Sequence, residues 1–204
     1  MVGYFIGAEE TGKYAVSSKI AMLIGLIIVV ANLILAPRLA QLSSEDSFGE
    51  FRKLAEKSTF YLGLIGIMAF CFFFIFGEYI LSIFGSEFSQ DLTLLIVLSF
   101  GQLVNVFVGP VGYVIIALNR ESVLGIYSTI ALGINATLNV VLITHFGVMG
   151  AAVATALSVI LFNVFCLFYI RGKKGFFTIS VWLKPARSWR YFKIGLINLK
   201  QLIV

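Results

Sequence analysis

The sequence predicts an all-α integral membrane protein with about five transmembrane helices. Of its 204 residues, 60% are hydrophobic and only 12% are charged, and the mean hydropathy of +1.01 is far from the balance of a soluble domain. No ten-residue units alternate apolar and polar side chains, as the strands of a lipid-facing barrel do. Because backbone groups in lipid must be bonded within the chain, the helix is the structure that remains.

Five runs of mostly apolar residues are long enough to cross a hydrocarbon core about 30 Å thick, which takes about 20 residues. They cover residues 14–35, 59–83, 92–118, 122–143 and 148–170. We therefore expect an exterior segment at 1–13, a five-helix transmembrane bundle at 14–171 and a tail at 172–204.

The basic residues predict how these helices are oriented. The loop after the first helix, the loop after the third helix and the tail lie on one side of the membrane, and they hold every Lys and Arg except Lys13 and Lys19. Since basic residues are retained in the cytoplasm, we expect the N-terminus outside and the C-terminus inside. The net charge of +5 is then a signal of topology, and it requires no nucleic acid as a partner.

The loop after the first helix contains an amphipathic element at 47–58. Its apolar helical face consists of Phe48, Phe51, Leu54 and Ala55, and its charged face of Arg52, Lys53, Glu56 and Lys57. Ser47 and Glu50 have the spacing of a capping box, in which each side chain bonds a backbone N–H of the other residue. We expect a short helix on the cytoplasmic membrane surface; an ordinary solvated loop is the alternative.

The tail at 172–204 mixes basic residues with aromatic ones. The aromatic residues are Phe176, Phe177, Trp182, Trp189, Tyr191 and Phe192. This combination suits the headgroups of an anionic inner leaflet, so anionic membrane lipids are expected partners. Pro185 divides the tail in two, and the sequence does not predict the structure of either part.

The polar residues within the expected helices are amides and hydroxyls. The candidates for a polar cavity are Ser17, Ser18, Asn32, Gln102, Asn105, Asn135 and Asn139. Gln102 and Asn105 share one helix face, as do Asn135 and Asn139. Two interpretations stay open for each residue: a hydrogen bond that holds packed helices together, or the lining of a cavity.

Two other features of the helices have a structural explanation. Gly150, Ala154 and Ser158 form a stripe of small residues, which is expected to face another helix. Cys71 and Cys166 lie at different depths of their helices, so we interpret them as small filler residues without a redox role.

The sequence lacks the signatures of an enzyme and of a metal or cofactor site. His145 is the only histidine, and no cluster of Cys or acidic residues lies at metal-ligand spacing from it. Glu78, Glu87 and Asp91 all fall toward the outer surface, so the helices hold no carboxylate pair for acid–base catalysis. We expect no catalytic residue, no cofactor and no metal, and interpret the chain as a conduit or a scaffold.

Several motifs, in this order along the chain, resemble the C-terminal half of the polysaccharide exporters. They are "YFIGAEETGKYAVSSKIAM", "LAPRLAQL", "FGEYILSIFGSEF", "GP", "ALNRES" and "NATLNVVLITHFGVMGAAVATALS", which together cover roughly residues 3 to 172. The family consists of O-antigen and teichoic-acid type flippases for lipid-linked oligosaccharides, within the multidrug/oligosaccharidyl-lipid/polysaccharide exporter superfamily. The resemblance rests on the order of the motifs, because no single one is specific.

The resemblance implies a place within a larger architecture. Family members have twelve or fourteen helices in two lobes around a central cavity, and the five helices here are similar to helices eight to twelve. The first lobe and the seventh helix are absent, so we expect a fragment, a truncated gene product or half of a split transporter. The activity implied is translocation of an undecaprenyl-diphosphate-linked sugar from the inner to the outer leaflet of a bacterial or archaeal plasma membrane. A drug/cation antiporter of the same superfamily and a non-transporting scaffold subunit are the alternatives.

The resemblance also implies a role for Lys19, which lies in the first expected helix. In the related lipid II flippase branch, a basic residue at about this place faces the cavity and is implicated in handling the anionic pyrophosphate. A bare ammonium at a helix centre costs about 2.5 to 3.5 kcal/mol on insertion scales, and a hydrated cavity removes most of that cost. The alternative is that Lys19 snorkels to the outer interface on its long stem.

Overall fold

The computed structural model describes residue 3, residues 7–183 and residue 191, and this part of the chain is helical without a strand. The elements are α2 (Ala8–Gln41), η1 (Glu45–Ser47), α3 (Phe48–Ser82), η2 (Ser86–Asp91), α4 (Leu92–Phe107), α5 (Val111–Ala117), α6 (Glu121–Lys174) and α7 (Ser180–Leu183). The expected all-α fold is therefore confirmed.

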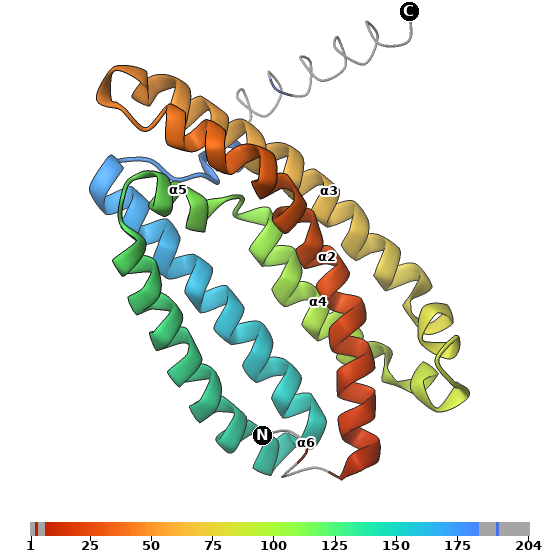
Figure 1. Ribbon diagram of the computed structural model, residues 1–204. Coiled ribbons are helices and arrows are strands. Elements are labelled where there is room, and N and C mark those ends of the chain that lie inside the picture. Colours follow the sequence, from red (N-terminus) through yellow and green to blue (C-terminus); the bar gives the residue numbers. More distant parts are fainter. Residues whose placement is uncertain (1–2, 4–6, 184–190, 192–204) are drawn as a thin grey trace, which may run out of the picture.

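The described helices supply five segments that are able to cross a membrane. Four units are long and apolar enough: α2, α3, α4 together with α5, and α6. With 54 residues, α6 is roughly 80 Å of helix, more than twice the thickness of a hydrocarbon core. At Gly147 its backbone is not helical, with φ 55° and ψ −137°, and the chain turns back there, so that α6 consists of two antiparallel limbs (Figure 1).

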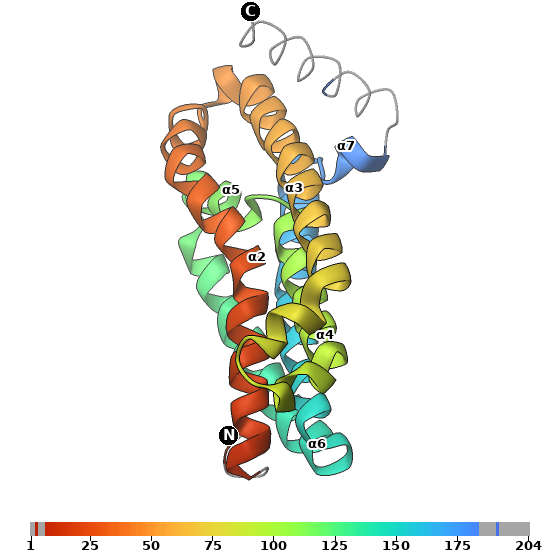
Figure 2. The same cartoon turned by 90° about the vertical axis from the view of Figure 1, so that its right-hand side faces the viewer.

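Helix α4 lies in the middle of the bundle, with α2, α3 and α6 packed around it (Figure 2). Small residues allow this close packing. An added Cβ at Gly101 would lie 2.9 Å from the Cα atom of Ala156 on the second limb of α6. An added Cβ at Gly77 of α3 would lie 3.1 Å from a methyl group of Leu95. Backbones that approach so closely gain dispersion contacts, which drive helix association where lipid offers no hydrophobic gain.

The expected helix at 92–118 is broken into α4 and α5. Gly109 has φ +77°, a conformation that side chains disfavour, and an added Cβ there would overlap Thr59. Pro110 follows and cannot donate a backbone hydrogen bond. The break frees the carbonyl oxygen of Val108, which accepts a hydrogen bond from the Thr178 hydroxyl at 2.7 Å. The Thr59 hydroxyl lies 3.5 Å from the same oxygen and has its shorter bond, of 2.8 Å, to the carbonyl of Ala55.

The start of the expected tail is a packed part of the bundle. Phe176, Thr178 and Val181 are almost completely buried, and the Trp182 ring stacks on Phe107 with the ring centroids 5.0 Å apart. Residues 176–183, which we name the return segment, thus cover the junction between α4 and α5. The rest of the expected tail, apart from Tyr191, lies outside the described residues.

The expectation of a separate surface helix at 47–58 is wrong. Residues 48–58 are helical, but they form the first turns of α3, which continues without interruption to Ser82. Phe51 and Ala55 are fully buried, because the apolar face finds protein partners such as Phe176 in the bundle. Ser47 does precede the first helical residue, yet its side chain makes no capping bond, so the capping box is not formed.

Three further boundaries differ from expectation. Residues 8–13, expected in an exterior segment, are the first turns of α2, because Glu9, Glu10 and Lys13 pair along one helix face. Residues 1–2 and 4–6 of that segment lie outside the described residues. The loop expected at 144–147 shrinks to the single non-helical residue Gly147, since its positive φ reverses the chain at once. Helix α6 also extends beyond 170 to Lys174.

Candidate functional site

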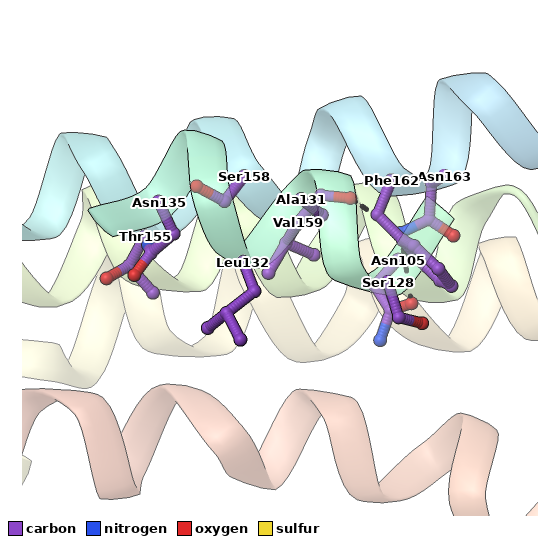
Figure 3. Close-up of a pocket in the computed structure, with 10 residues that line it drawn as sticks. All are labelled: Asn105, Ser128, Ala131, Leu132, Asn135, Thr155, Ser158, Val159, Phe162 and Asn163. Atoms are coloured by element: carbon purple, nitrogen blue, oxygen red, sulfur yellow. Dashed lines mark hydrogen bonds between the residues drawn. The ribbon is translucent and has the colours of Figure 1, made fainter. Parts of the chain in front are cut away.

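A polar groove lies between α4 and the two limbs of α6. Its volume is about 460 Å³ and it is open on one side. Its lining consists of Asn105, Ser128, Ala131, Leu132, Asn135, Thr155, Ser158, Val159, Phe162 and Asn163. Figure 3 shows the side chains from both limbs gathered along one channel, with Asn135 and Thr155 toward one end and Asn105 and Asn163 toward the other. We name this set the polar groove.

Hydrogen bonds join the three walls of the polar groove. The side-chain nitrogen of Asn163 donates to the side-chain oxygen of Asn105 at 3.2 Å and to the carbonyl of Val159 at 2.9 Å. At the other end, the side-chain nitrogen of Asn135 lies 3.4 Å from the carbonyl oxygen of Ala154. An amide has two donors and two lone pairs, so Asn105 and Asn135 keep positions that these bonds do not use, whereas both hydrogens of the buried Asn163 amide are engaged.

The outer helix α2 reaches the polar groove at one point. The hydroxyls of Tyr14 and Thr155 are 2.8 Å apart and share a hydrogen bond. Thr155 lies at the end of the groove where Asn135 is also found (Figure 3). The contact holds the start of α2 against the second limb of α6.

None of the ten residues that line the polar groove is charged. Six carry hydroxyls or amides, and four are apolar. Hydroxyls and amides form directional hydrogen bonds without the desolvation cost of a charge. Such a surface suits a neutral ligand that is rich in hydroxyl groups, with apolar patches where the ligand has C–H faces.

The structure brings together only some of the expected site residues. Asn105 and Asn135 line the polar groove. Asn139 lies beside it, 94% buried, and its side-chain nitrogen donates to the carbonyl oxygen of Asn135 at 2.8 Å and to its side-chain oxygen at 3.0 Å. Asn135 and Asn139 thus form a bonded pair at one end of the groove, and Asn105 lies at the other end.

The other candidates on α2 and α4 do not line the polar groove. Ser17 and Asn32 are buried where α2 meets its neighbours, and the Ser17 hydroxyl and the Asn32 side-chain oxygen have no hydrogen-bond partner in the described part of the chain. Gln102 packs over Gly25, since an added Cβ there would lie 2.5 Å from its side-chain oxygen. Ser18 is half-buried on α2.

Lys19 is exposed on the face of α2 that points away from the bundle. Large apolar side chains share this face, and Leu23, Leu26 and Val30 are all more than half exposed. Lys19 is therefore the one charged side chain among apolar neighbours on this part of the described helix. It does not line the polar groove.

Sequence reasoning missed three residues of the polar groove as cavity candidates: Ser128, Thr155 and Ser158. Their spacing contains a usable signal. Ser128 and Asn135 are seven residues apart on one limb, as are Thr155 and Phe162 on the other, so each pair lies on one helix face. The signal identifies a face, but only the reversal at Gly147 makes the two faces meet.

The family was identified by comparison with known proteins. The family model described as MatE matches residues 1–141, which include α2 to α5 and most of the first limb of α6. The chain belongs to the MatE family. This membership agrees with the resemblance to the polysaccharide exporters and makes the chain a multi-pass membrane protein.

Curated relatives of this MatE chain share about a quarter of its residues. The probable low-salt glycan biosynthesis flippase Agl15 of Haloferax volcanii is 27% identical over 205 residues, covering 100% of this chain and 41% of the relative. The probable flippase AglR of the same organism is 27% identical over 80% of this chain and 35% of its own length. The capsular polysaccharide biosynthesis protein CapF of Staphylococcus aureus is 28% identical over 74% of this chain and 39% of its own length.

The chain thus spans only 35 to 41% of the length of these relatives. No solved structure matches the chain. The geometry of the polar groove therefore comes from this structure itself.

Proposed function

We propose that this chain forms one lobe of a flippase that moves a lipid-linked oligosaccharide, of the undecaprenyl-diphosphate class, from the inner to the outer leaflet of a plasma membrane. Membership of the MatE family and the names of the relatives support transport as the activity. The observation that carries the proposal is the polar groove, since its uncharged lining combines hydroxyls and amides with apolar side chains, a mixture that suits the hydroxyl groups and C–H faces of a sugar.

In this proposal the chain performs no covalent chemistry. The amides Asn105 and Asn135 exchange hydrogen bonds with sugar hydroxyls as the groove opens to one leaflet and then to the other. Hydrogen bonds of this kind are modest in strength, at about 0.5–1.5 kcal/mol net each, so the ligand is held and then released. The ligand shifts the balance between the two states of the groove only by the difference in its affinity for them.

Lys19 is proposed to attract the diphosphate of the same substrate. Its face of α2 is exposed and largely apolar, which suits a surface shared with a first lobe made by other residues. A hydrated space between the two lobes would lower the cost of an ammonium in the membrane. Ser17, Asn32 and Gln102 are then contacts between packed helices, whereas Ser18 and Asn139 flank the substrate path.

The proposal includes an orientation, with the C-terminus in the cytoplasm. It is tested by placing single cysteines at Asp46 and at His145, in a chain with Cys71 and Cys166 replaced. Both positions are exposed at opposite ends of the bundle. An impermeant maleimide added to intact cells should label position 145 and spare position 46 until the membrane is opened. Labelling of position 46 in intact cells would reverse the orientation.

The function itself is tested with the complete transporter in proteoliposomes, by following the translocation of a labelled lipid-linked oligosaccharide. Lys19→Gln should lower the initial rate about tenfold or more, since a charge-assisted contact is worth about 1.5–3 kcal/mol. Lys19→Arg should keep part of the rate, because the charge survives. Lys13→Gln is the matched control, since it removes a charge from the same helix outside the apolar run and should leave the rate intact.

The outcomes separate the competing functions. Equal rates for wild type and Lys19→Gln at equal abundance would contradict the role of Lys19 and support snorkelling. Loss of translocation in Asn105→Leu and Asn135→Leu, with normal insertion, would support the polar groove as the sugar site. If no translocation of the labelled oligosaccharide is measured when the chain is combined with a first lobe, the chain is a non-transporting scaffold subunit.

A further inference from the structure

A second hollow, lined mainly by basic residues, lies where α5 ends and where α6 both begins and ends. Its volume is about 200 Å³, and its lining is Leu118, Arg120, Tyr169, Lys173 and Lys174. The two ends of α6 meet here because the helix turns back at Gly147. We name it the basic hollow; it is separate from the polar groove and shares no residue with it.

Within the described residues no ion pair joins the three cations of the basic hollow to a carboxylate, and Glu121, which follows Arg120, is not among the lining residues. The ion pairs in this part of the chain join Lys13 to Glu9 and Glu10, and Arg52 to Glu56. The side chains of Arg120 and Lys173 also have no hydrogen-bond partner among the described residues. Three like charges around one small hollow repel one another, and an anion in the hollow turns that repulsion into attraction.

Helix dipoles explain part of this arrangement and leave Arg120 unexplained. Lys173 and Lys174 lie in the last turn of α6, where cations are favourable. Arg120 lies at the opposite end, directly before the first residue of α6, where the helix dipole disfavours a cation and favours an anion. Glu121 in the first turn of α6 already supplies a negative charge to the helix terminus, so it is the guanidinium of Arg120 that favours a further anion on this side of the hollow.

Neighbouring contacts fix the shape of the basic hollow. The Lys174 ammonium lies 5.2 Å from the centre of the Phe48 ring on α3, a cation–π contact that holds its position. Arg171 is directed elsewhere, since it donates to the carbonyl of Gly175 and lies 5.5 Å from the Phe177 ring centre. Arg120 and Lys173 thus remain available to a ligand.

We propose that the basic hollow binds a phosphate group of an anionic phospholipid at the membrane surface. A guanidinium grips phosphate oxygens in a bidentate manner, and an ammonium adds a point charge beside it. Tyr169 places a phenol at the same surface, and Leu118 supplies an apolar edge next to the lipid. Basic pockets between transmembrane helices are suited to such headgroups. The proposal does not depend on the transport proposal, because it involves other residues.

The test is native mass spectrometry of the full 204-residue chain in detergent, titrated with phosphatidylglycerol and, separately, with phosphatidylcholine. Wild type should retain phosphatidylglycerol in preference to phosphatidylcholine. Arg120→Gln with Lys173→Gln and Lys174→Gln should weaken this retention by about fivefold for each charge removed. The matched control removes three charges at the same end of the bundle, as Arg38→Gln with Lys53→Gln and Lys57→Gln, and should retain lipid as wild type does.

A second arm distinguishes a lipid phosphate from a free phosphate. Inorganic pyrophosphate is added in place of the lipid, and its failure to bind supports a site that needs a phospholipid. Binding of pyrophosphate that the control variant keeps and the hollow variant loses, without a preference of wild type for phosphatidylglycerol, would assign the site to soluble phosphate and overturn the lipid proposal. Equal weakening in both triple variants, or no preference of wild type for the anionic lipid together with no pyrophosphate binding, overturns the proposal. Lys173→Gln alone provides the same comparison if the triple variant does not fold.

Discussion

The side-chain nitrogen of Asn163 lies 3.2 Å from the side-chain oxygen of Asn105, and this bond joins the second limb of α6 to α4 across the polar groove. Asn163 is almost fully buried, whereas Asn105 is half-buried and lines the groove. The Asn163–Asn105 pair therefore fits both interpretations of the polar residues within the helices. It is a contact between helices and also part of a cavity wall.

The pair predicts a measurable coupling in stability. Asn163→Ala and Asn105→Ala should each destabilise the bundle, and their effects should be non-additive by about 0.6 kcal/mol, the average for hydrogen bonds between membrane helices. The measurement is reversible unfolding in mixed detergent micelles for both single variants and the double variant. Strict additivity would show that the bond contributes nothing to stability.

Two glycines of α6 predict opposite responses to alanine. An added Cβ at Gly150 would overlap the carbonyl oxygen of Leu142 on the other limb, whereas nothing lies within 4 Å of such an atom at Gly133. Gly150→Ala should therefore cost about 1–3 kcal/mol by overpacking. Gly133→Ala should stabilise α6 by about 0.5–1 kcal/mol, because alanine favours the helix. Unfolding in detergent measures both, and equal effects would contradict the close contact of the limbs.

The hydrogen bond of Thr178 predicts that the return segment stabilises the junction between α4 and α5. Its hydroxyl donates to the carbonyl of Val108, which the break between α4 and α5 leaves without a helical partner. Thr178→Val should cost about 1–3 kcal/mol, since a buried acceptor loses its better donor. Proteolysis within residues 176–183 should also become faster. The control is Thr129→Val, whose exposed hydroxyl bonds only within its own helix; similar effects of both variants would exclude a special role for residues 176–183.

Asp91 predicts a pH dependence of stability. Burial raises the pKa of its carboxyl above the ordinary 3.8, Lys13 opposes this shift, and Glu10 and Glu9 add to it. One oxygen of Asp91 has no hydrogen-bond partner. Because the folded chain then binds the proton more tightly than the unfolded chain, stability falls as the pH rises from about 3.8 to the raised pKa and is constant above it.

The test for Asp91 compares thermal unfolding of wild type and Asp91→Asn in detergent between acidic and neutral pH. The variant should be more stable than wild type at neutral pH, and the difference should vanish in acid. Glu9, Glu10 and Lys13 are present in both proteins, so the comparison isolates Asp91. A constant difference across the pH range would contradict a raised pKa.

The sequence by itself determined the class of this protein and where its helices lie. Hydropathy and the hydrogen-bonding of backbone in lipid are local properties, so runs such as 14–35 and 59–83 identify helices without knowledge of their neighbours. It also contained the family resemblance, since motif order is a property of the chain alone. The helices are broken at Gly109 and Gly147, and both glycines can be read from the sequence. A glycine alone, however, does not indicate whether it bends the chain or packs within a helix.

Only the tertiary structure decided which polar residues meet. Asn135 and Asn105 share the polar groove, whereas Asn32 and Gln102, which are of the same chemical kind, are packed between helices. Helical periodicity assigns each residue to a face, but the neighbour of that face depends on close packing between segments far apart in the chain. The return segment illustrates the same limit, because Thr178 finds the carbonyl of Val108 across 70 residues of sequence, and no local pattern encodes that contact.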